Sequence, residues 1–541
     1  MYLKKIGKFF SAVFILLLMA ANTCTAAVWQ WSVNVKGVIS SETNEHPTAF
    51  LWIPPNCKQV KGIIIGQHNM LEEGILEHPE FRKTLTDLGF AEIWITPSID
   101  MVFDFNSTTP ACFEGMMKDL ANISGYKELA FAPVVPIGHS AAASYPWNFG
   151  AWDPGRTLAI LSIHGDAPLT THTGSGRPNP DWGQRNIDGI PALMVMGEYE
   201  WGEQRILPAM QYKNDHPHAA LAFLADAGHG HFDYSDELVR FLCLFLKKAA
   251  EYRLPTVMPL DGPAKLRPVD PATGWLVDRW RLDKPLHAPA AAYKKYTGDR
   301  KEAFWVFDEE MAKATESYYT EARGKTRQYI GFEQHGDLLS GGNSFAGNRI
   351  EFIPYEDGIT FNLSAAFKDS VQARTATDKH ADGKINITRI CGPIEKINDT
   401  TFRISFYRMG FNNAKRSGDI WLMASNAGDK IYKSAVQQAN LKIPVRNQEG
   451  ADQQINFPTI ANQSSKQKYI ELKASSSAGA KVYYYVEEGP AEIDGDKLKF
   501  TKIPPRAKYP VKVTVVAWQW GKTNAPKLKS AEPVTQSFNI Y

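Results

Sequence analysis

The sequence predicts an α/β domain with a mostly parallel sheet and helices on both faces, followed by β-rich domains. Three observations predict this organisation. Residues 28–254 alternate short runs of branched side chains with amphipathic helical patterns, as chains with parallel sheets do. Residues 255–290 are rich in proline and lack periodicity, which is typical of a linker. Residues 291–541 are mostly β-like, and a chain of 541 residues is too long for one core.

The first segment contains eight strand-like runs. They are VWQWSVNV, TAFLWIP, GIIIG, AEIWITP, FAPVVPIG, LAILSIHG, ALMVMG and ALAFLADA. No helical pattern separates the first two runs, which predicts an antiparallel start to the sheet. Helical patterns follow later runs and include PEFRKTLTDLG, FEGMMKDLANI and DELVRFLCLFLKKAAEYR.

Two β-rich domains are expected after the linker. Residues 291–441 combine β-like runs with one helical segment, KEAFWVFDEEMAKATESYYTEA. Residues 442–541 look entirely β-like. From Ile455 onward, the sequence resembles immunoglobulin-like modules of exported bacterial enzymes, most clearly in the segment ASSSAGAKVYYYVEEGPAEIDGDKLKFT. That resemblance implies an immunoglobulin-like β-sandwich for the last domain.

The N-terminus has the pattern of a secretory signal peptide over residues 1–27. Lysines precede FFSAVFILLLMAA, and the small, polar NTCTAA follows it. We therefore expect export to the periplasm, the cell surface or the outside of a bacterium. The apolar run is short for a membrane-spanning helix, so no transmembrane helix is expected. A lipid anchor on Cys24 stays open.

Charge and cysteine content exclude some function classes. With a net charge of only +2, the chain lacks the excess of basic residues expected of a nucleic-acid-binding protein. The cysteines after the signal peptide have no metal-like spacing, and Cys243 lies in an apolar helical pattern that predicts a buried thiol. We expect no cofactor and no metal.

Ser140 carries the main chemical signal. It ends the β-like run FAPVVPIGHS and precedes a row of alanines, so it fits either a helix N-terminus or a nucleophile on a sharp strand-to-helix turn. Gly138 leaves room for such a turn. The pattern is G-x-S-x-A, in which Ala142 replaces the usual second glycine.

An acid and a histidine follow Ser140 along the chain, each after a predicted strand. Glu200 comes just after the run ALMVMG, with Glu198 and Glu203 as alternatives. His229 comes after ALAFLADA and is the expected base, with His231 as the alternative. The order serine, acid, histidine, with each residue after a predicted strand, resembles the α/β-hydrolase superfamily.

That resemblance also implies two oxyanion donors. One is the backbone N–H of Ala141, directly after the nucleophile. The other comes from the loop after the third strand, where His68 and Asn69 stand in place of the His-Gly of many esterases. The N–H of Asn69 or of Met70 is the expected second donor.

A long polar loop between the sixth and seventh strands is expected to overhang the site. Tryptophan can stack on sugar rings, and arginine can bind a carboxylate. The expected substrate-binding residues are His68, His164, Arg177, Trp182, Arg185 and Trp201. The alternative is that these residues merely close the loop onto the domain.

Two other functions use the same residues. His229, His231 and Asp233 have the H-x-H-x-D spacing of zinc-binding metallo-β-lactamase-type hydrolases. Here, however, Tyr234 stands where that motif has a further histidine, and the motif precedes the last helix of the domain. A catalytically inactive glycan-binding protein on a hydrolase scaffold is the second alternative.

The exported hydrolase domain followed by β-rich domains resembles bacterial carbohydrate esterases. The nearest group is the pectin methylesterases of carbohydrate esterase family 19. The resemblance implies a serine esterase that removes methyl esters from galacturonate in pectic polysaccharide of the plant cell wall, through an acyl-enzyme. A polysaccharide O-acetylesterase is the alternative with the same triad.

Overall fold

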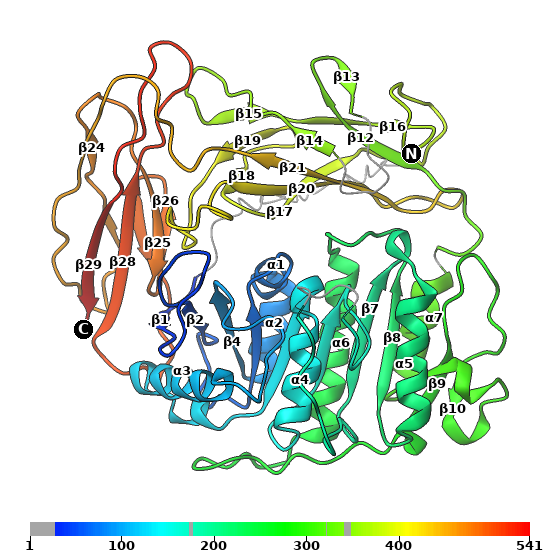
Figure 1. Ribbon diagram of the computed structural model, residues 1–541. Helices are drawn as coiled ribbons and strands as arrows, with labels where there is room; N and C mark the ends of the chain where they lie inside the picture. The colour runs from blue at the N-terminus through cyan, green and yellow to red at the C-terminus, as the bar shows by residue number, and fades with distance from the viewer. Residues whose placement is uncertain (1–27, 172–176, 321, 340–347) are drawn as a thin grey trace, which may run out of the picture.

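The computed structural model describes residues 28–171, 177–320, 322–339 and 348–541. The predicted signal peptide and Cys24 lie outside the described residues. The α/β domain forms the lower part of Figure 1, the middle β-rich module lies above it, and the C-terminal module stands at one side.

An eight-stranded sheet forms the centre of the α/β domain, in the order β1-β2-β4-β3-β5-β6-β7-β8. Strands β1 and β2 are antiparallel, as is the β2–β4 pair, and every later pairing is parallel. This confirms the mostly parallel sheet and its antiparallel start. The strands are β1 (Trp31–Asn34), β2 (Thr48–Trp52), β3 (Gly62–Gln67), β4 (Phe90–Thr96), β5 (Val134–His139), β6 (Ile160–Ile163), β7 (Ala192–Gly197) and β8 (Leu221–Asp226).

Strands β3 to β8 are buried along their whole length, which explains why they read as continuous apolar runs. The helices of the domain are α1 (Glu72–Leu76), α2 (Pro79–Leu88), α3 (Thr109–Ser124), α4 (Ser144–Trp152), α5 (Glu203–Asp215) and α6 (Asp236–Arg253). The buried side chains of α6 belong to the same core as those of the sheet.

Part of the predicted linker is folded, so residues 255–290 are not wholly a connector. Strand β9 (Trp275–Asp278) pairs with β10 (Ala291–Ala292) and β11 (Ala303–Val306) in a small sheet. Helix α7 (Glu309–Thr320) follows, and its buried residues join the core of the α/β domain. The predicted helical segment therefore begins as a strand, because a four-residue buried apolar run fits either structure by periodicity.

The middle module is β-rich, as predicted, and consists of small sheets around one core. Phe361, Phe402, Ile420 and Leu422 lie in that core. Its strands are β12 (Tyr329–Gln334), β13 (Asp337–Leu338), β14 (Asn348–Ile350), β15 (Thr360–Asn362), β16 (Ser364–Lys368), β17 (Asn386–Cys391), β18 (Ile394–Lys396), β19 (Thr401–Ile404), β20 (Asp419–Asn426) and β21 (Ala435–Lys442).

The C-terminal module has two antiparallel three-stranded sheets, β23-β27-β26 and β25-β28-β29, and a short β22–β24 pair. Leu498, Val513 and Val515 form part of its core. The immunoglobulin-like assignment stays a prediction. The strands are β22 (Ile455–Asn456), β23 (Tyr469–Glu471), β24 (Ser475–Ser476), β25 (Tyr483–Glu488), β26 (Ala491–Asp494), β27 (Lys497–Phe500), β28 (Val511–Trp518) and β29 (Val534–Ile540).

The middle module covers loops that follow parallel strands of the eight-stranded sheet. The Gln438 side chain donates to Asp233 at 2.5 Å, and Tyr199 donates to the Ser434 carbonyl at 2.9 Å. Near helix α1, the buried Arg408 lies 2.8 Å from a Glu73 carboxylate oxygen. The middle module is thus in direct contact with loops that carry predicted site residues.

A buried ion pair joins the middle module to the α/β domain. The Lys433 ammonium lies 2.6 Å from Glu198 and 2.5 Å from Asp283, and the Lys433 and Glu198 side chains are both fully buried. We expect Lys433→Met to destabilise the protein by about 3–5 kcal/mol, because Glu198 loses its buried counter-charge. Chemical denaturation measures the loss. The exposed Lys430, changed to Met, is the matched control, and equal stability of the two variants would contradict the prediction.

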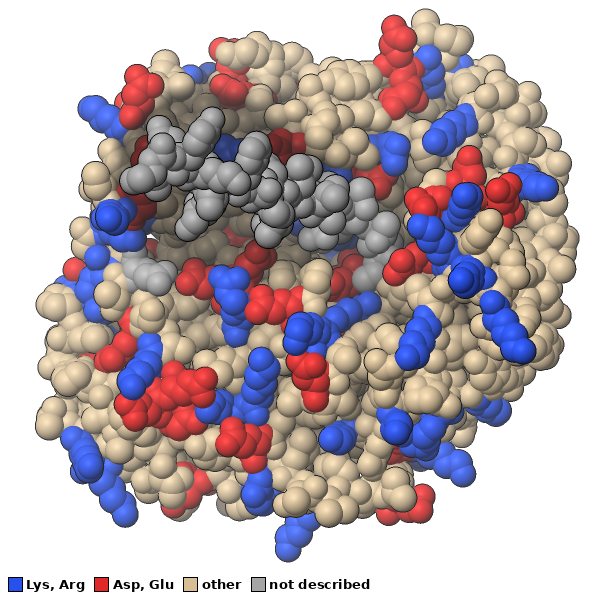
Figure 2. Space-filling view, turned by 180° about the vertical axis from the view of Figure 1, so that it is seen from behind, with Lys and Arg blue, Asp and Glu red and all other residues tan. Residues whose placement is uncertain are grey.

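The described cysteines are all buried and free, which confirms the buried thiol at Cys243. None of the helices in the described part of the chain is long and apolar enough to cross a membrane. On the face shown in Figure 2, acidic and basic side chains are interspersed over the surface.

Candidate active site

Ser140 occupies a strained turn between β5 and the following helices. Its φ is +52°, in the left-handed region that non-glycine residues rarely adopt. A short 3-10 helix (Ser140–Ala142) begins there and leads into α4. A Cβ on Gly138 would overlap the carbonyl oxygen of Ala142, so only glycine fits. This is the geometry of a nucleophile elbow, and together with the sheet order it defines an α/β-hydrolase fold.

His231, not His229, lies against Ser140. The Ser140 hydroxyl lies 2.6 Å from His231 Nε2, where it can donate a hydrogen bond. The Nδ1 atom of the same ring lies 2.5 Å from Glu200 Oε2. Serine, imidazole and carboxylate thus form one continuous hydrogen-bonded relay.

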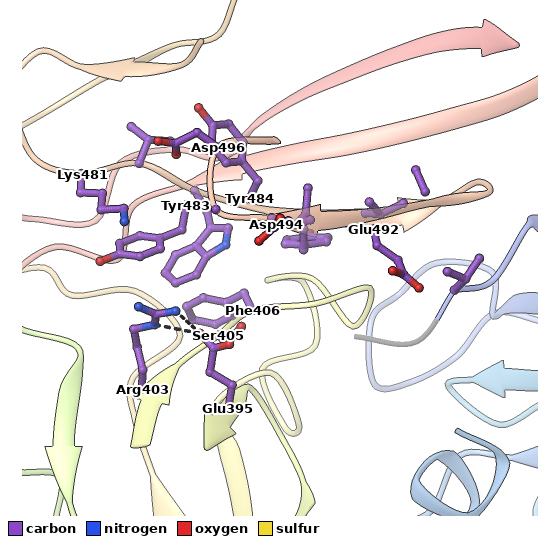
Figure 3. Close-up of a pocket in the computed structure, with 18 of the residues that line it drawn as sticks. Glu395, Arg403, Ser405, Phe406, Lys481, Tyr483, Tyr484, Glu492, Asp494 and Asp496 are labelled. Carbon is purple, nitrogen blue, oxygen red and sulfur yellow. Dashed lines mark hydrogen bonds and ion pairs between the residues drawn. The ribbon is translucent and has the colours of Figure 1, made fainter. Parts of the chain in front are cut away.

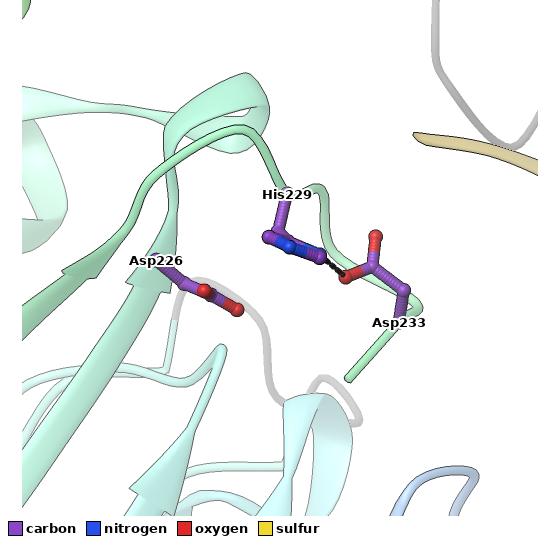
Figure 4. A group of neighbouring side chains, drawn as sticks. All are labelled: Asp226, His229 and Asp233. Atoms are coloured by element: carbon purple, nitrogen blue, oxygen red, sulfur yellow. Dashed lines mark hydrogen bonds and ion pairs between the residues drawn. The ribbon is translucent and has the colours of Figure 1, made fainter. Parts of the chain in front are cut away.

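The assignment of His229 as the base is therefore wrong. Its Nδ1 lies 2.7 Å from Asp233 Oδ1, and Figure 4 shows the ring between Asp226 and Asp233. Burial disfavours the charged ring, but the charges of Asp226 and Asp233 outweigh it and raise the pKa of His229 to about 10. An imidazole that already carries a proton at neutral pH cannot act as a base.

The H-x-H-x-D motif does not converge on one point. Asp226, His229 and Asp233 offer ligand atoms within 4.8 Å of one another. However, His231 points to Ser140 and Glu200 instead. The His229–Asp233 hydrogen bond also accounts for one ring nitrogen of the cluster. The motif spacing therefore reflects an ion pair beside the relay rather than the ligand set of a zinc hydrolase.

The carboxylate that lies against His231 is that of Glu200, at 2.5 Å from the ring. Burial would raise its pKa, but the hydrogen bonds from His164 and His231 outweigh burial and hold the pKa of Glu200 well below its usual range. Arg205 also donates to Glu200 Oε2 at 2.6 Å. The alternatives have other partners: Glu198 pairs with Lys433, and Glu203 pairs with Arg279.

The expected oxyanion donors on the loop after β3 are used elsewhere. The backbone N–H groups of Asn69 and Met70 both donate to Glu72 Oε2, at 3.1 and 2.9 Å. The assignment of these two donors is therefore wrong in this structure. The other carboxylate oxygen of Glu72 accepts the His139 N–H at 2.7 Å, which ties the loop to β5. Burial raises the pKa of Glu72 to about 7. Ala141 keeps its expected place directly after Ser140.

Three of the expected substrate-binding residues are buried structural residues. Trp182 donates its indole N–H to Asn148 at 2.8 Å, and His68 lies 2.8 Å from the Thr96 hydroxyl. His164 is fully buried against Glu200. Their side chains cannot contact a polysaccharide in this conformation, so the assignment of these three is wrong.

The other three lie at the surface but have partners of their own. Arg177 is about half exposed and lies 2.7 Å from Asp100. The Arg185 guanidinium lies 5.0 Å from the centre of the Phe105 ring. Trp201 is partly buried and packs edge-on against Phe223. A role in substrate binding stays a prediction for these residues.

His139 is a site residue that the sequence argument missed. Its Nε2 lies 2.8 Å from the carbonyl oxygen of His231, so this nitrogen carries the proton and donates. Burial and the neighbouring histidines hold the pKa of His139 well below its usual range, which keeps the ring neutral. His139 thus fixes the backbone that presents the His231 ring. Its position directly before the serine was the available signal.

A separate cleft of about 280 Å³ lies between the middle and C-terminal modules. Figure 3 shows Arg403 and Glu395 on one wall and Lys481, Tyr483 and Asp494 on the other. The described residues that line it include none of the predicted site residues. Trp518 stacks on the Tyr483 ring, and the Arg403 and Lys481 cations lie 5.5 and 5.3 Å from its centre.

The fold is similar to several solved structures. No protein-family profile and no curated protein sequence matches the chain. FphF, a fluorophosphonate-binding serine hydrolase of Staphylococcus aureus, is 12% identical, with 41% of this chain and 96% of that chain covered and a TM-score of 0.28. A truncated carbohydrate esterase from gut microbiota is 12% identical over 42% of this chain and 99% of that chain, with a TM-score of 0.28. A CE1 ferulic acid esterase from Anaeromyces mucronatus is 13% identical over 39% and 87%, with a TM-score of 0.27.

Proposed function

We propose that this protein is a serine ester hydrolase in which Ser140 is the nucleophile, His231 the base and Glu200 the acid. The observation that carries the proposal is the relay from the Ser140 hydroxyl through the His231 ring to Glu200, at 2.6 and 2.5 Å. The strained backbone of Ser140 supports it, because such strain concentrates at functional sites.

The reaction follows from the roles of these atoms. The Ser140 oxygen attacks the ester carbonyl while His231 Nε2 takes the hydroxyl proton. Glu200 stabilises the imidazolium that forms, and the Ala141 N–H donates to the developing oxyanion. Collapse of this intermediate releases the alcohol, which receives the proton from His231, and leaves an acyl group on Ser140. Water, deprotonated by His231, then attacks the acyl group and releases the acid and free Ser140.

The proposed substrate is an ester of a polysaccharide, with the methyl ester of galacturonate in pectin first and a sugar O-acetyl ester second. The resemblance of the domain order to exported carbohydrate esterases supports this choice, as do Arg177 and Arg185 on the loop after β6. Export to the periplasm or beyond, and an immunoglobulin-like C-terminal module, belong to the same proposal.

Product analysis on native pectin tests the proposal. Wild type and Ser140→Ala are incubated with methyl-esterified, acetylated pectin, and released methanol and acetate are measured. Methanol from wild type alone supports the methylesterase, and acetate alone moves the substrate to sugar acetates with the same triad. A folded wild type that binds pectin but releases neither product would favour the binding protein and overturn the enzyme.

The middle module brings an aromatic side chain close to the relay. The Phe232 ring lies edge-on to His231 with 4.5 Å between ring centres, and Trp421 of β20 lies 5.2 Å from Phe232. The Trp421 indole N–H is fixed by Asp419 at 2.8 Å. The Trp421 side chain is partly exposed, so it can contact a sugar ring next to the reacting ester.

We expect Trp421→Ala to lower kcat/KM on polymeric pectin about 10-fold, which corresponds to the loss of one aromatic stacking contact. Its kcat/KM on p-nitrophenyl acetate should stay unchanged, because that ester has no sugar ring. Initial rates on the two substrates give the comparison, and Trp421→Phe should recover most of the loss. An equal loss on both substrates would mean that Trp421 acts only through the fold.

A further inference from the structure

The Glu200 carboxylate contacts two imidazole rings, one at each oxygen. The Nδ1 atom of His164, at the end of β6, lies 2.8 Å from Glu200 Oε1, while His231 is bound to the other oxygen. The backbone N–H of Gly197 lies 3.1 Å from both Oε1 and the Nδ1 atom of His164. Glu200 is thus held between two histidines, and only one of them reaches Ser140.

His164 is buried between two carboxylates and has an unusual backbone conformation. Its side chain is fully buried, and its φ of +47° lies in the left-handed region. Its Nε2 lies 3.8 Å from Asp226 Oδ2, and neither atom has a hydrogen-bond partner among the described residues. A buried imidazole between two carboxylates is in the environment that stabilises its protonated form.

The charged groups around His164 come from every element packed against it. They are Glu200 after β7, Asp226 at the end of β8, Asp233 and His231 in the loop before α6, His139 at the end of β5, and Arg205 in α5. Burial disfavours the imidazolium, but the hydrogen bond and charge of Glu200 and the charge of Asp226 outweigh it and raise the pKa of His164.

We propose that His164 is a positioning residue that, as a buried imidazolium, holds Glu200 in place and shares its negative charge with His231. The inference rests on the proposed function, since it assigns a role toward the base of that same relay. Held at Oε1, the carboxylate keeps Oε2 directed at His231. Because part of the charge of Glu200 is balanced by His164, less of that charge acts on the His231 ring.

Replacing His164 with asparagine tests the charge and keeps a donor for Glu200. We expect the acid limb of the kcat/KM–pH profile on p-nitrophenyl acetate to move to higher pH by about half a unit or more, since Glu200 then acts on the His231 ring with its full charge. KM should stay unchanged. His164→Ala, which also loses the donor, should lower the plateau kcat about 10-fold, the size expected for one lost hydrogen bond to a charged group. The matched control is His335→Asn, which changes an exposed histidine paired with Glu351.

A measurement without substrate tests the charge of His164 separately. A histidine whose pKa is raised by folding contributes stability that is complete below about pH 6.5 and is lost as pH rises through the folded pKa. In the Ser140→Ala background, the Tm loss caused by His164→Asn should therefore be larger at about pH 5.5 than at about pH 9, by about 2 °C or more.

Either of two results overturns the inference. One is a His164→Asn profile that superimposes on wild type apart from a uniform loss of rate, which would mark a purely structural side chain. The other is a Tm loss that does not decrease with rising pH, which would mean that His164 loses no stabilising proton between these pH values. A wild type that turns over no ester but shows the expected pH-dependent Tm loss would overturn the proposed function, and the positioning role with it, while leaving the charge of His164 established.

Discussion

Replacing His231 with glutamine lowers kcat for ester hydrolysis by about 10⁴-fold or more, as the loss of a triad base does in serine hydrolases. Glutamine can still bond to Ser140 or Glu200, but it cannot accept the hydroxyl proton. The expected result depends on the distance of 2.6 Å between His231 Nε2 and the Ser140 hydroxyl. Steady-state rates on p-nitrophenyl acetate, corrected for the folded fraction, measure the loss.

The matched variant is His229→Gln, which changes the other histidine of the same loop. We expect its rate per folded molecule to stay within about 10-fold of wild type, since the relay is intact. Its stability should fall by about 3–5 kcal/mol, because Asp226 and Asp233 lose the imidazolium between them. That loss should be complete below about pH 6.5 and should vanish as pH rises through about 10, the folded pKa of His229. An inactive His229→Gln beside an active His231→Gln would reverse the assignment.

Ser140→Ala should lower kcat by about 10⁵-fold or more, since no acyl-enzyme can form without the hydroxyl. The variant should fold normally, because alanine at a φ of +52° is no more strained than serine. It should also keep the affinity of the wild type for pectin, measured by affinity electrophoresis. Undiminished product from this variant would show that Ser140 only begins a helix.

The fold was predictable because its signal is local and repeated. Strands buried on both faces, such as β3 and β7, are short apolar runs whatever surrounds them. The positions of Ser140 after β5 and Glu200 after β7 followed from the same pattern. Strand β9 was missed because it is one short strand of a small sheet, and its neighbourhood in the sequence is rich in proline.

The choice between His229 and His231 could not be made from the sequence. Two residues of one loop differ only in which way the backbone turns them, and contacts distant in the chain decide that. His139 binds the carbonyl of His231, and Gln438 of the middle module binds Asp233 and so holds the partner of His229. Neither contact leaves a spacing signal.

The predictions of the oxyanion donors and of the substrate-binding residues failed for a related reason. The N–H groups of Asn69 and Met70 follow the expected strand, but Glu72 two to three residues later accepts both. Trp182 and His164 lie on the expected loop, yet both side chains are buried. A loop position predicts proximity to the site, whereas the direction of a side chain depends on its tertiary partners.

The middle module shows what a domain-by-domain interpretation leaves out. Lys433 and Trp421 lie more than two hundred residues after Ser140. Even so, Lys433 pairs with Glu198, and Trp421 packs against Phe232, the neighbour of His231. Because side chains of the middle module contact these two loops of the α/β domain, we expect the geometry of the proposed active site to depend on the middle module.

Covalent labelling with an alkyl fluorophosphonate tests the central claim most directly, because it detects an activated serine whatever the natural ester is. Wild type is incubated with the reagent near neutral pH, digested and mapped by mass spectrometry, with His231→Gln treated in parallel. The account predicts one phosphonyl group on Ser140 of wild type, with labelling strongly slowed in His231→Gln. A wild type without a label on Ser140, or equal labelling of the two proteins, would contradict it.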